Sequence, residues 1–349
     1  MEIVSDPRDM QAVSLAWRKL GQTIAFVPTM GFFHEGHLSL MRYGRERGDR
    51  LVVSLYVNPT QFGPTEDLDR YPRDAERDAA LAREVGVDVL YTPGSAQMYP
   101  EGYQTYVTVE DLTQGLCGSS RPGHFRGVAT VVLKLFHQVL PHLAVFGEKD
   151  YQQLAVIRRM VVDLNVPVEV VGRPIVREAD GLALSSRNTY LSPQERRSAL
   201  CLYEALTQAR DEAASGETKA DNILSQVIQT ITSTPDTRLD YAVLVDPDTL
   251  HGVDTIQGAA RLAVAAWVGD TRLNEMVHVY NISNGERFQT YAMEGEAGSG
   301  IVCLNGAAAR RGAVGDLIII TTYSNYPPEE LNHHTPKIIL VDSHNRIQK

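Results

Sequence analysis

The first half of the chain alternates short apolar runs with stretches in which apolar residues recur every three or four positions. The short runs predict buried strands at 23–27, 51–57, 87–91, 143–146 and 166–170. The periodic stretches predict helices at 38–47, 74–84, 128–140 and 151–164. Alternation of this kind is typical of α/β proteins with a doubly wound parallel sheet. We therefore expect a Rossmann-like, nucleotide-binding domain over residues 1–175.

The pattern changes after about residue 175. A polar loop is followed by a long helical stretch at 192–215 and then by mixed helix and strand patterns that end near residue 272. We expect a smaller α+β domain over residues 176–273. Beyond it, apolar and polar residues alternate and Asn284-Gly285 is a hairpin signal, so residues 274–349 predict an all-β tail.

Composition narrows the class of protein that carries this pattern. Of the 349 residues 43% are hydrophobic and 22% charged, and the formal net charge is -10, which argues against a nucleic-acid partner or an anionic membrane. No apolar run approaches the roughly 20 residues that span a bilayer, and the start of the chain lacks a signal-peptide pattern. Three scattered cysteines make no metal spacing and suit a reducing compartment. We therefore expect a cytoplasmic protein.

The densest chemistry follows the strand at 23–27. Residues 28–37 read Pro-Thr-Met-Gly-Phe-Phe-His-Glu-Gly-His, a glycine turn that opens a helix and sets His34 and His37 three residues apart. A helix start offers unpaired N–H groups and the positive end of the dipole, so the turn can bind phosphate with the imidazoles as added donors. The same residues also fit a capped structural turn or half of a metal site, although no third ligand lies nearby in the sequence.

Two further segments offer charge and hydroxyl groups. Lys149 follows a predicted strand, and it can either neutralise phosphate or stand as a solvated surface lysine. The loop at 180–188, which we call the serine loop, contains Ser185, Ser186 and Arg187. It can close over a triphosphate, or it can form only a cap and a turn.

Three polar segments of the chain come directly after predicted strands. In a doubly wound sheet, ligands bind beyond the carboxyl ends of the strands. We therefore expect the histidine turn, residues 58–61 and residues 147–150 to line one crevice.

Over residues 1–273 the chain resembles the pantothenate synthetase family, the pantoate–β-alanine ligases of coenzyme A biosynthesis. The resemblance rests on the stretch quoted for 28–37, on Val-Asn-Pro-Thr-Gln-Phe-Gly at 57–63, on Phe-Gly-Glu-Lys-Asp-Tyr-Gln-Gln at 146–153, and on Arg-Glu-Ala-Asp-Gly-Leu-Ala-Leu-Ser-Ser-Arg-Asn at 177–188. It implies that ATP adenylates pantoate with loss of pyrophosphate and that β-alanine then displaces AMP. Another adenylyl or cytidylyl transferase with the same histidine turn is the alternative, and a protein that only binds nucleotide would leave Lys149 and the serine loop without a role.

The resemblance also implies roles for individual residues. The catalytic group would be His34, His37, Lys149, Ser185, Ser186 and Arg187, with His37 as proton donor. The ATP-binding set would be Met30, Gly31, Phe32, Phe33, His34, Glu35, Gly36, His37, Gly147, Glu148, Lys149, Asp150, Val176, Leu184, Ser185, Ser186 and Arg187. Gln61 and Gln153 resemble the glutamines that bind pantoate and β-alanine. Met30 and Val176 fit simple core packing equally well.

The resemblance further implies Mg²⁺ and a homodimer. We expect the Mg²⁺ to accompany ATP, held through few protein carboxylates and several waters rather than in a metal site of the protein. Asp78 is a candidate contact for this ion, and in the sequence it is equally a helix-surface acid.

The tail resembles aspartate 1-decarboxylase, the enzyme that makes β-alanine, through residues 284–291 and 304–309 followed by Val314-Gly315-Asp316. The resemblance implies a partial double-psi barrel, with active-site matches at Arg287, Thr290, Tyr291 and Asn305. The family's early lysine and self-cleaving Gly-Ser bond are missing, and Gly298-Ser299 falls at an uncleaved position. We therefore expect no pyruvoyl group and hence no electron sink for decarboxylation.

Two hypotheses remain for the tail. It can be a working decarboxylase half, completed by another chain, that supplies β-alanine to the ligase. It can also be a structural module that helps the ligase oligomerise, because a barrel fragment leaves strand edges that need a partner. The missing front segment favours a fragment that no longer catalyses a reaction.

Overall fold

The structure is a computed structural model, and it describes residues 1–64 and 66–280. The decarboxylase-like positions Arg287, Thr290, Tyr291 and Asn305, the pair Gly298-Ser299 and nearly all of the expected all-β tail lie outside the described residues. The elements of the larger domain are β1 (Glu2–Val4), α1 (Pro7–Lys19), β2 (Ile24–Thr29), α2 (Glu35–Arg47), β3 (Arg50–Leu55), α3 (Ala75–Val85), β4 (Val89–Tyr91), α4 (Ser95–Met98), α5 (Cys117–Ser120), α6 (His124–Val139), β5 (Leu143–Gly147), α7 (Tyr151–Asp163) and β6 (Glu169–Arg173).

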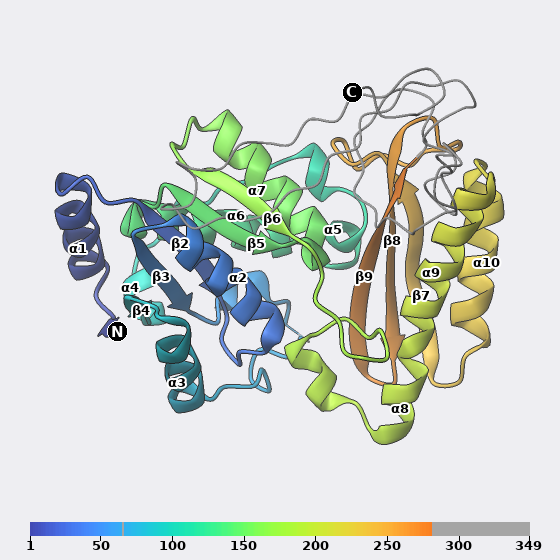
Figure 1. The fold of residues 1–349 in the computed structure, drawn as a ribbon, viewed down its shortest axis with the longest axis horizontal. Helices are drawn as coiled ribbons and strands as arrows, with labels where there is room; N and C mark the ends of the chain where they lie inside the picture. Colours follow the sequence, from blue (N-terminus) through green and yellow to red (C-terminus); the bar gives the residue numbers. More distant parts are fainter. Residues whose placement is uncertain (65, 281–349) are drawn as a thin grey trace, which may run out of the picture.

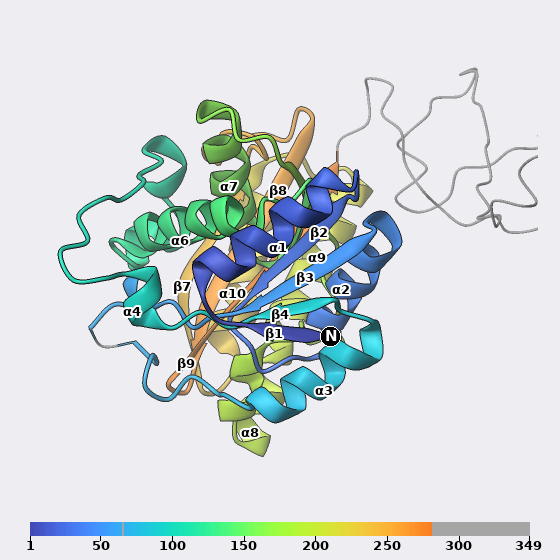
Figure 2. The same cartoon turned by 90° about the vertical axis from the view of Figure 1, so that its left-hand side faces the viewer.

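Six parallel strands form the sheet of this domain, in the order β1-β4-β3-β2-β5-β6. Phe26, Val52 and Phe146 point to the face covered by α1, α6 and α7, whereas Val27 and Val53 point to the face covered by α2 and α3. Figure 2 shows these two helical layers on either side of the strands. The sheet is therefore apolar on both faces, as parallel sheets require, and the Rossmann-like α/β class is confirmed.

The predicted strands differ from the observed ones mainly at their ends. Four of the five lie within two residues of their expected starts, but the fifth begins at Glu169 instead of 166. The reason is a turn after α7, where Asn165 adopts a left-handed φ of 52° and Val166 bonds back to Val161. The sequence analysis did not identify β1, because a three-residue strand carries almost no periodic signal, and it also missed the 13-residue helix α1.

The second part of the chain contains α8 (Pro193–Ser198), α9 (Leu200–Ser215), α10 (Ala220–Ser233), β7 (Thr237–Val245), β8 (Ala259–Val268) and β9 (Thr271–Tyr280). The strands form an antiparallel sheet in the order β7-β8-β9. As Figure 1 shows, α9 and α10 cover one face of this sheet. On the other face Val245, Ala263 and Met276 join the apolar cluster of the larger domain, so the two parts share a core.

Two expectations about this part need correction. The helical stretch predicted at 192–215 is two helices, since a new helix begins at Leu200 after α8. The tail was expected to begin at residue 274, but β9 pairs with β8 as far as Tyr280. Residues 274–280 therefore belong to the smaller sheet, because the alternating pattern predicts a strand without identifying its partner. None of the described helices is long and apolar enough to cross a membrane.

Candidate active site

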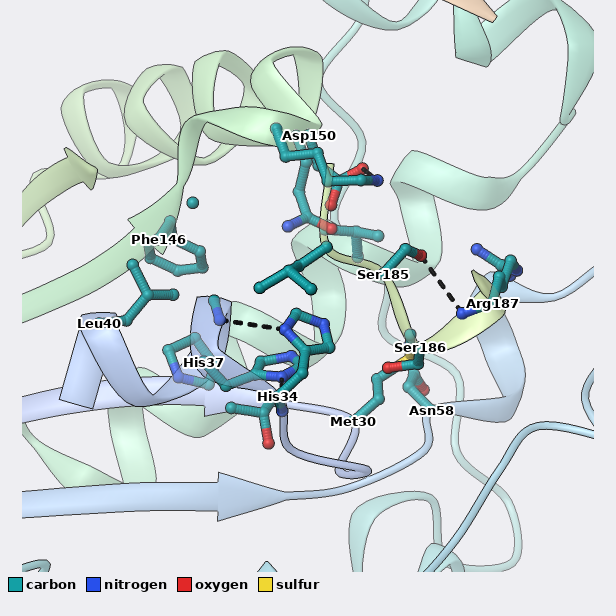
Figure 3. A pocket seen from close by; sticks show the side chains of 18 of the residues that line it. Met30, His34, His37, Leu40, Asn58, Phe146, Asp150, Ser185, Ser186 and Arg187 are labelled. Carbon is teal, nitrogen blue, oxygen red and sulfur yellow. Dashed lines mark hydrogen bonds and ion pairs between the residues drawn. The ribbon is translucent and has the colours of Figure 1, made fainter. Parts of the chain in front are cut away.

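A cavity of about 230 Å³ opens at the carboxyl ends of β2, β3 and β5, beneath the loop that follows β6. The predicted site residues that line it are Met30, His34, Gly36, His37, Gln61, Gly147, Lys149, Asp150, Gln153, Val176, Leu184, Ser185, Ser186 and Arg187. The crevice expected from the strand ends thus forms. Figure 3 shows the two histidine rings, Asp150 and residues 185–187 around one space.

Five residues of the expected ATP-binding set do not line this cavity. Phe33 is fully buried in the core beneath α2 and α3. Glu35 pairs with Arg42 on the exposed side of α2, and Glu148 accepts a hydrogen bond from His278 Nε2 at 2.8 Å. The other two, Gly31 and Phe32, form the turn behind the histidines.

The histidine turn has an unusual backbone, and a buried carboxylate stabilises it. Gly31 has a φ of 89° and Phe32 a φ of 53°, a left-handed conformation that costs a side-chain-bearing residue free energy. Asp78 on α3, 1% exposed, accepts hydrogen bonds from Phe32 N at 2.6 Å and Phe33 N at 2.7 Å. Burial raises the pKa of Asp78. Asp78 is therefore neither a helix-surface acid nor, in this structure, open to a metal ion.

The two histidines cap the start of α2. Gly36 N donates to His34 Nδ1 at 3.1 Å, and His34 N donates to His37 Nδ1 at 3.3 Å, while the ring centroids lie 4.1 Å apart. Burial lowers the pKa of His34 to about 4 and that of His37 to about 3. Both rings are therefore neutral at pH 7. Because each Nδ1 accepts a hydrogen bond, the ring proton is on Nε2, which makes Nε2 the donor that remains for a ligand.

This capping differs in one respect from the sequence expectation. We expected the N–H groups of the helix start to be open to phosphate, but Gly36 N already donates to the ring of His34. Added side-chain volume at Gly36 would also meet that ring, since a Cβ there would lie 2.8 Å from His34 Cε1. The imidazole Nε2–H groups, rather than this backbone N–H, are thus the donors that the turn offers.

Lys149 lies in a short 3₁₀ helix, η3 (Glu148–Asp150), directly after β5. Its side chain is 19% exposed and lies 3.8 Å from Asp150 Oδ1. Its ammonium donates to Asn274 Oδ1 on β9 at 3.3 Å. The ammonium is therefore held against the cavity and is not a solvated surface group.

The serine loop reaches the cavity from a tight hairpin in which Arg177 and Ala183 pair. Ser185 Oγ accepts a hydrogen bond from Arg187 N at 3.3 Å. Arg187 makes two bonds of 2.9 Å to the carboxylate of Asp67, a residue of the segment between β3 and α3. The loop thus serves both as a cap and as part of the cavity wall. Because Arg187 is already paired with Asp67, an anion that binds to Arg187 must compete with that carboxylate.

Gln61 is held by four neighbours, of which the sequence analysis had assigned Met30 and Asn58 to the site but not His124 and Arg121. Its side-chain Nε2 approaches Met30 Sδ at 3.3 Å, and its Oε1 accepts from Asn58 Nδ2 at 3.0 Å. Its main-chain oxygen accepts from His124 Nδ1 at 2.8 Å and from Arg121 Nη2 at 3.3 Å. Burial lowers the pKa of His124 to about 4, so this ring is also neutral.

Asn58 itself is 1% exposed and lines the cavity. The sequence analysis expected residues 58–61 to line the crevice, and the structure places Asn58 there. Much of the remaining wall of the cavity is apolar, and α6 contributes Val128, Val131, Val132 and Leu135 to it. One side of the space therefore offers hydrogen-bond donors and the other excludes water. Among the described residues, no group of three or more His, Cys, Asp or Glu side chains could hold a metal ion.

Comparison with known proteins gives two family matches. Residues 2–277 match the model of the pantoate-beta-alanine ligase family, and residues 256–348 match that of aspartate decarboxylase. The pantothenate synthetase of Syntrophus aciditrophicus is 58% identical over 273 residues, which cover 78% of this chain and 96% of that protein. That of Syntrophotalea carbinolica is 60% identical over the same length and the same shares.

Solved structures agree with the sequence matches. The crystal structure of pantothenate synthetase from Thermus thermophilus has a TM-score of 0.76 and 48% identity, covering 80% of this chain and 100% of that one. The pantoate-beta-alanine ligase from Francisella tularensis, complexed with beta-gamma ATP and beta-alanine, has a TM-score of 0.67 and 31% identity. It covers 79% of this chain and 97% of that one.

Proposed function

The chain belongs to the pantoate–β-alanine ligase family, the pantothenate synthetases, and from this premise we propose that it makes pantothenate in two steps through a pantoyl-adenylate. In the first step, the carboxylate of (R)-pantoate attacks the α-phosphorus of ATP and pyrophosphate leaves. In the second, the amine of β-alanine attacks the adenylated carbonyl carbon, loses a proton, and AMP leaves. The observation that carries the proposal is the single cavity that brings together His34, His37, Lys149, the serine loop and both glutamines.

The first step needs no nucleophile from the protein, because the substrate carboxylate is the nucleophile. The protein must align this carboxylate with the α-phosphate and stabilise negative charge as pyrophosphate departs. We assign this work to the Nε2–H groups of His34 and His37, the ammonium of Lys149 and the guanidinium of Arg187. Since the pKa of His37 is lowered to about 3, we assign it the role of a neutral hydrogen-bond donor rather than an acid.

Pantoate carries hydroxyl groups on C2 and C4 and two methyl groups on C3. Gln61 and Gln153 offer amide donors and acceptors for the hydroxyl and carboxylate oxygens without adding charge. The apolar residues of α6 offer a surface for the methyl groups. We propose that β-alanine reaches the adenylate beside Gln61.

Magnesium is proposed to enter with the nucleotide. Among the residues that the structure describes, no cluster of side chains is suited to a resident metal ion, so this part of the chain does not fit a protein-built magnesium site. Mg²⁺ bound to ATP phosphates needs few protein ligands, and we treat MgATP as the substrate. The homodimer, the cytoplasmic location and the domain limit near residue 175 stay predictions.

The test is pantothenate formation, measured by mass spectrometry, from pantoate, ATP, Mg²⁺ and β-alanine. We expect one AMP and one pyrophosphate for each pantothenate. Reactions that replace ATP with CTP, or omit pantoate, are the controls. Product with CTP, or AMP release without pantoate, would contradict the proposal and favour a different nucleotidyltransferase reaction.

A second candidate activity rests on the aspartate decarboxylase match over residues 256–348. A working decarboxylase would convert L-aspartate to β-alanine and so supply the ligase. We propose instead that this part of the chain does not catalyse the reaction by itself, because it has no match to the family's self-cleaving Gly-Ser bond, which generates the pyruvoyl group, and Gly298-Ser299 falls at an uncleaved position. Pantothenate formed when L-aspartate is the only amine would overturn this, and product with β-alanine alone would support it.

A further inference from the structure

Two consecutive residues of β9 contact the cavity wall from opposite faces of the strand. Successive side chains of a strand point to opposite sides of the sheet. Asn274 points toward η3, where Lys149 lies, and Glu275 points toward the hairpin that precedes the serine loop. Both residues lie in the stretch that the two family models match in common, residues 256–277. One strand thus contacts both the segment that carries Lys149 and the hairpin that precedes the serine loop.

Asn274 bridges the two charged residues of η3. Its Oδ1 accepts from Lys149 Nζ at 3.3 Å, and its Nδ2 donates to Asp150 Oδ1 at 3.0 Å. A lysine side chain has four rotatable bonds, so an ammonium without such a partner would occupy many positions. The carboxamide restricts the ammonium to the side of the cavity without neutralising its charge.

Glu275 closes the hairpin from which the serine loop extends. Its side chain is 2% exposed, and its carboxylate pairs with the guanidinium of Arg177 and accepts from Ala183 N at 3.2 Å. Arg177 Nη1 also donates to Gly181 O at 2.9 Å, across the same hairpin. Ser185 follows only two residues after Ala183. The position of this carboxylate therefore determines where the serine loop begins.

We infer that Asn274 and Glu275 are positioning residues for ATP, and that β9 sets the spacing between Lys149 and the serine loop. The inference rests on the proposed function, in which both groups bind the phosphates of one ATP molecule. Reaction rates fall steeply when catalytic groups are displaced by as little as about 1 Å. Because β9 contacts both Lys149 and the hairpin before the serine loop, one rigid strand keeps the two at a fixed distance from each other.

The first experiment is a double-mutant cycle between Asn274 and Lys149 in the full chain. We expect Asn274→Ala to lower kcat/KM for ATP about tenfold, measured as pyrophosphate release from pantoate and ATP. In the Lys149→Ala background the same change should have no further effect, because Asn274 acts through Lys149. An equal loss in both backgrounds, or no loss in either, would overturn the assignment.

The second experiment separates the hairpin contact from general support of the strand. Glu275→Gln keeps an acceptor for Ala183 N but removes the charge that pairs with Arg177. We expect KM for ATP to rise about tenfold while KM for pantoate stays unchanged. The control is Asp240→Asn, which removes the ion pair between Asp240 and Arg272 of the same strand, away from the cavity. A similar rise in KM from both variants would indicate a purely structural role and overturn the inference.

Isothermal titration calorimetry with a nonhydrolysable ATP analogue repeats both tests without turnover, because it measures the affinity of each variant for the analogue. It gives a result even where Lys149→Ala leaves too little activity to measure. If the unmodified chain binds the analogue but forms no pantothenate, the proposed function fails while the positioning test remains valid. If the unmodified chain binds it and both β9 variants bind it equally well, the positioning inference fails and the proposed function stands.

Discussion

His34 and His37 offer a phosphate two hydrogen-bond donors that carry no charge. Their depressed pKa values follow mainly from burial, with the nearby Lys149 lowering both. A neutral donor keeps the positive charge of the site at Lys149 and Arg187, so the two rings can lie 4.1 Å apart without repelling each other. The arrangement depends on both Nδ1 atoms remaining acceptors.

We expect His37→Ala and Lys149→Ala each to lower turnover at least about tenfold, because each removes a donor aimed at developing phosphate charge. The measurement is the steady-state rate of pantothenate formation. Circular dichroism and melting temperature should show that the variants still fold. Rates equal to those of the unmodified chain would remove these residues from the proposed mechanism.

The stability of the fold should fall as the pH drops below about 6.5, the usual pKa of histidine. In the folded chain the pKa of His34 is about 4 and that of His37 about 3, whereas in the unfolded chain both return to about 6.5. Between these values the unfolded chain binds more protons than the folded one, so lowering the pH favours unfolding. His124, with a pKa of about 4, acts in the same direction. The check is the melting temperature from pH 7 to pH 5, which should fall less for His37→Gln. A flat profile would contradict the burial of these rings.

For single residues, the sequence predicted which side chains would lie at the cavity but not their protonation or hydrogen bonding. The spacing of His34 and His37 predicts two donors near a helix start, yet their tautomer follows from hydrogen bonds that only the folded turn creates. Asp78 lies in a helix rich in charged residues, where nothing in the pattern separates a buried carboxylate from an exposed one. Asn274 and Glu275 escaped notice because their partners lie far away in the sequence.

The histidine turn shows how one element depends on another. It joins β2 to α2, but the carboxylate that stabilises its left-handed backbone comes from α3. The sheet places α2 and α3 on the same face, which brings that carboxylate within reach. A local motif therefore depends on a distant helix for its conformation.

Asp78→Asn should weaken the turn, because one of the two N–H donors then faces an amide NH₂ instead of an oxygen. A hydrogen bond to a buried charged group contributes about 1.5–3 kcal/mol, and we expect a loss of that order in the free energy of unfolding. Urea denaturation measures it, with Glu76→Gln on the exposed side of the same helix as the control. Equal stability of the two variants would mean that Asp78 does not support the turn.

The periodicity of apolar residues predicted where elements with a buried face lie in the sequence, but it did not predict which elements they pair with. The strands at 23–27 and 143–146 were predictable because parallel strands buried on both sides are continuously apolar. The end of β9 was placed in the tail because alternation is the same whichever sheet a strand joins. Pairing depends on contacts across the molecule, and these leave no periodic signal.

For the whole molecule, the ligase match ends at residue 277 and the last described strand ends at residue 280. The relatives with 58–60% identity are covered over 96% of their length by 273 residues of this chain. The ligase part is therefore nearly a complete family member in length, followed by further sequence that matches a second family.

We expect a chain shortened to end at residue 280 to keep most of its ligase activity, and one that ends at residue 273 to lose it. The difference arises because the shorter chain lacks Asn274, Glu275 and their contacts with Lys149 and Arg177. Pantothenate formation by both chains, normalised to the folded fraction, is the measurement. Equal activity would show that the end of β9 is dispensable, and loss in both would show that the ligase needs the segment after residue 280.

The alternation of faces along β9 also limits how genes can recombine at this point. A turn of two residues, Gly269 and Asp270, joins β8 to β9, with Val268 paired to Thr271. Insertion or deletion of a single residue between this turn and Asn274 would exchange the faces of every side chain that follows. The sheet could still form, but Asn274 would no longer face Lys149 and Glu275 would no longer face Arg177. A fusion to a second module at this strand must therefore keep the reading frame of the gene. It must also insert or delete an even number of residues, so that each side chain stays on its own face of β9.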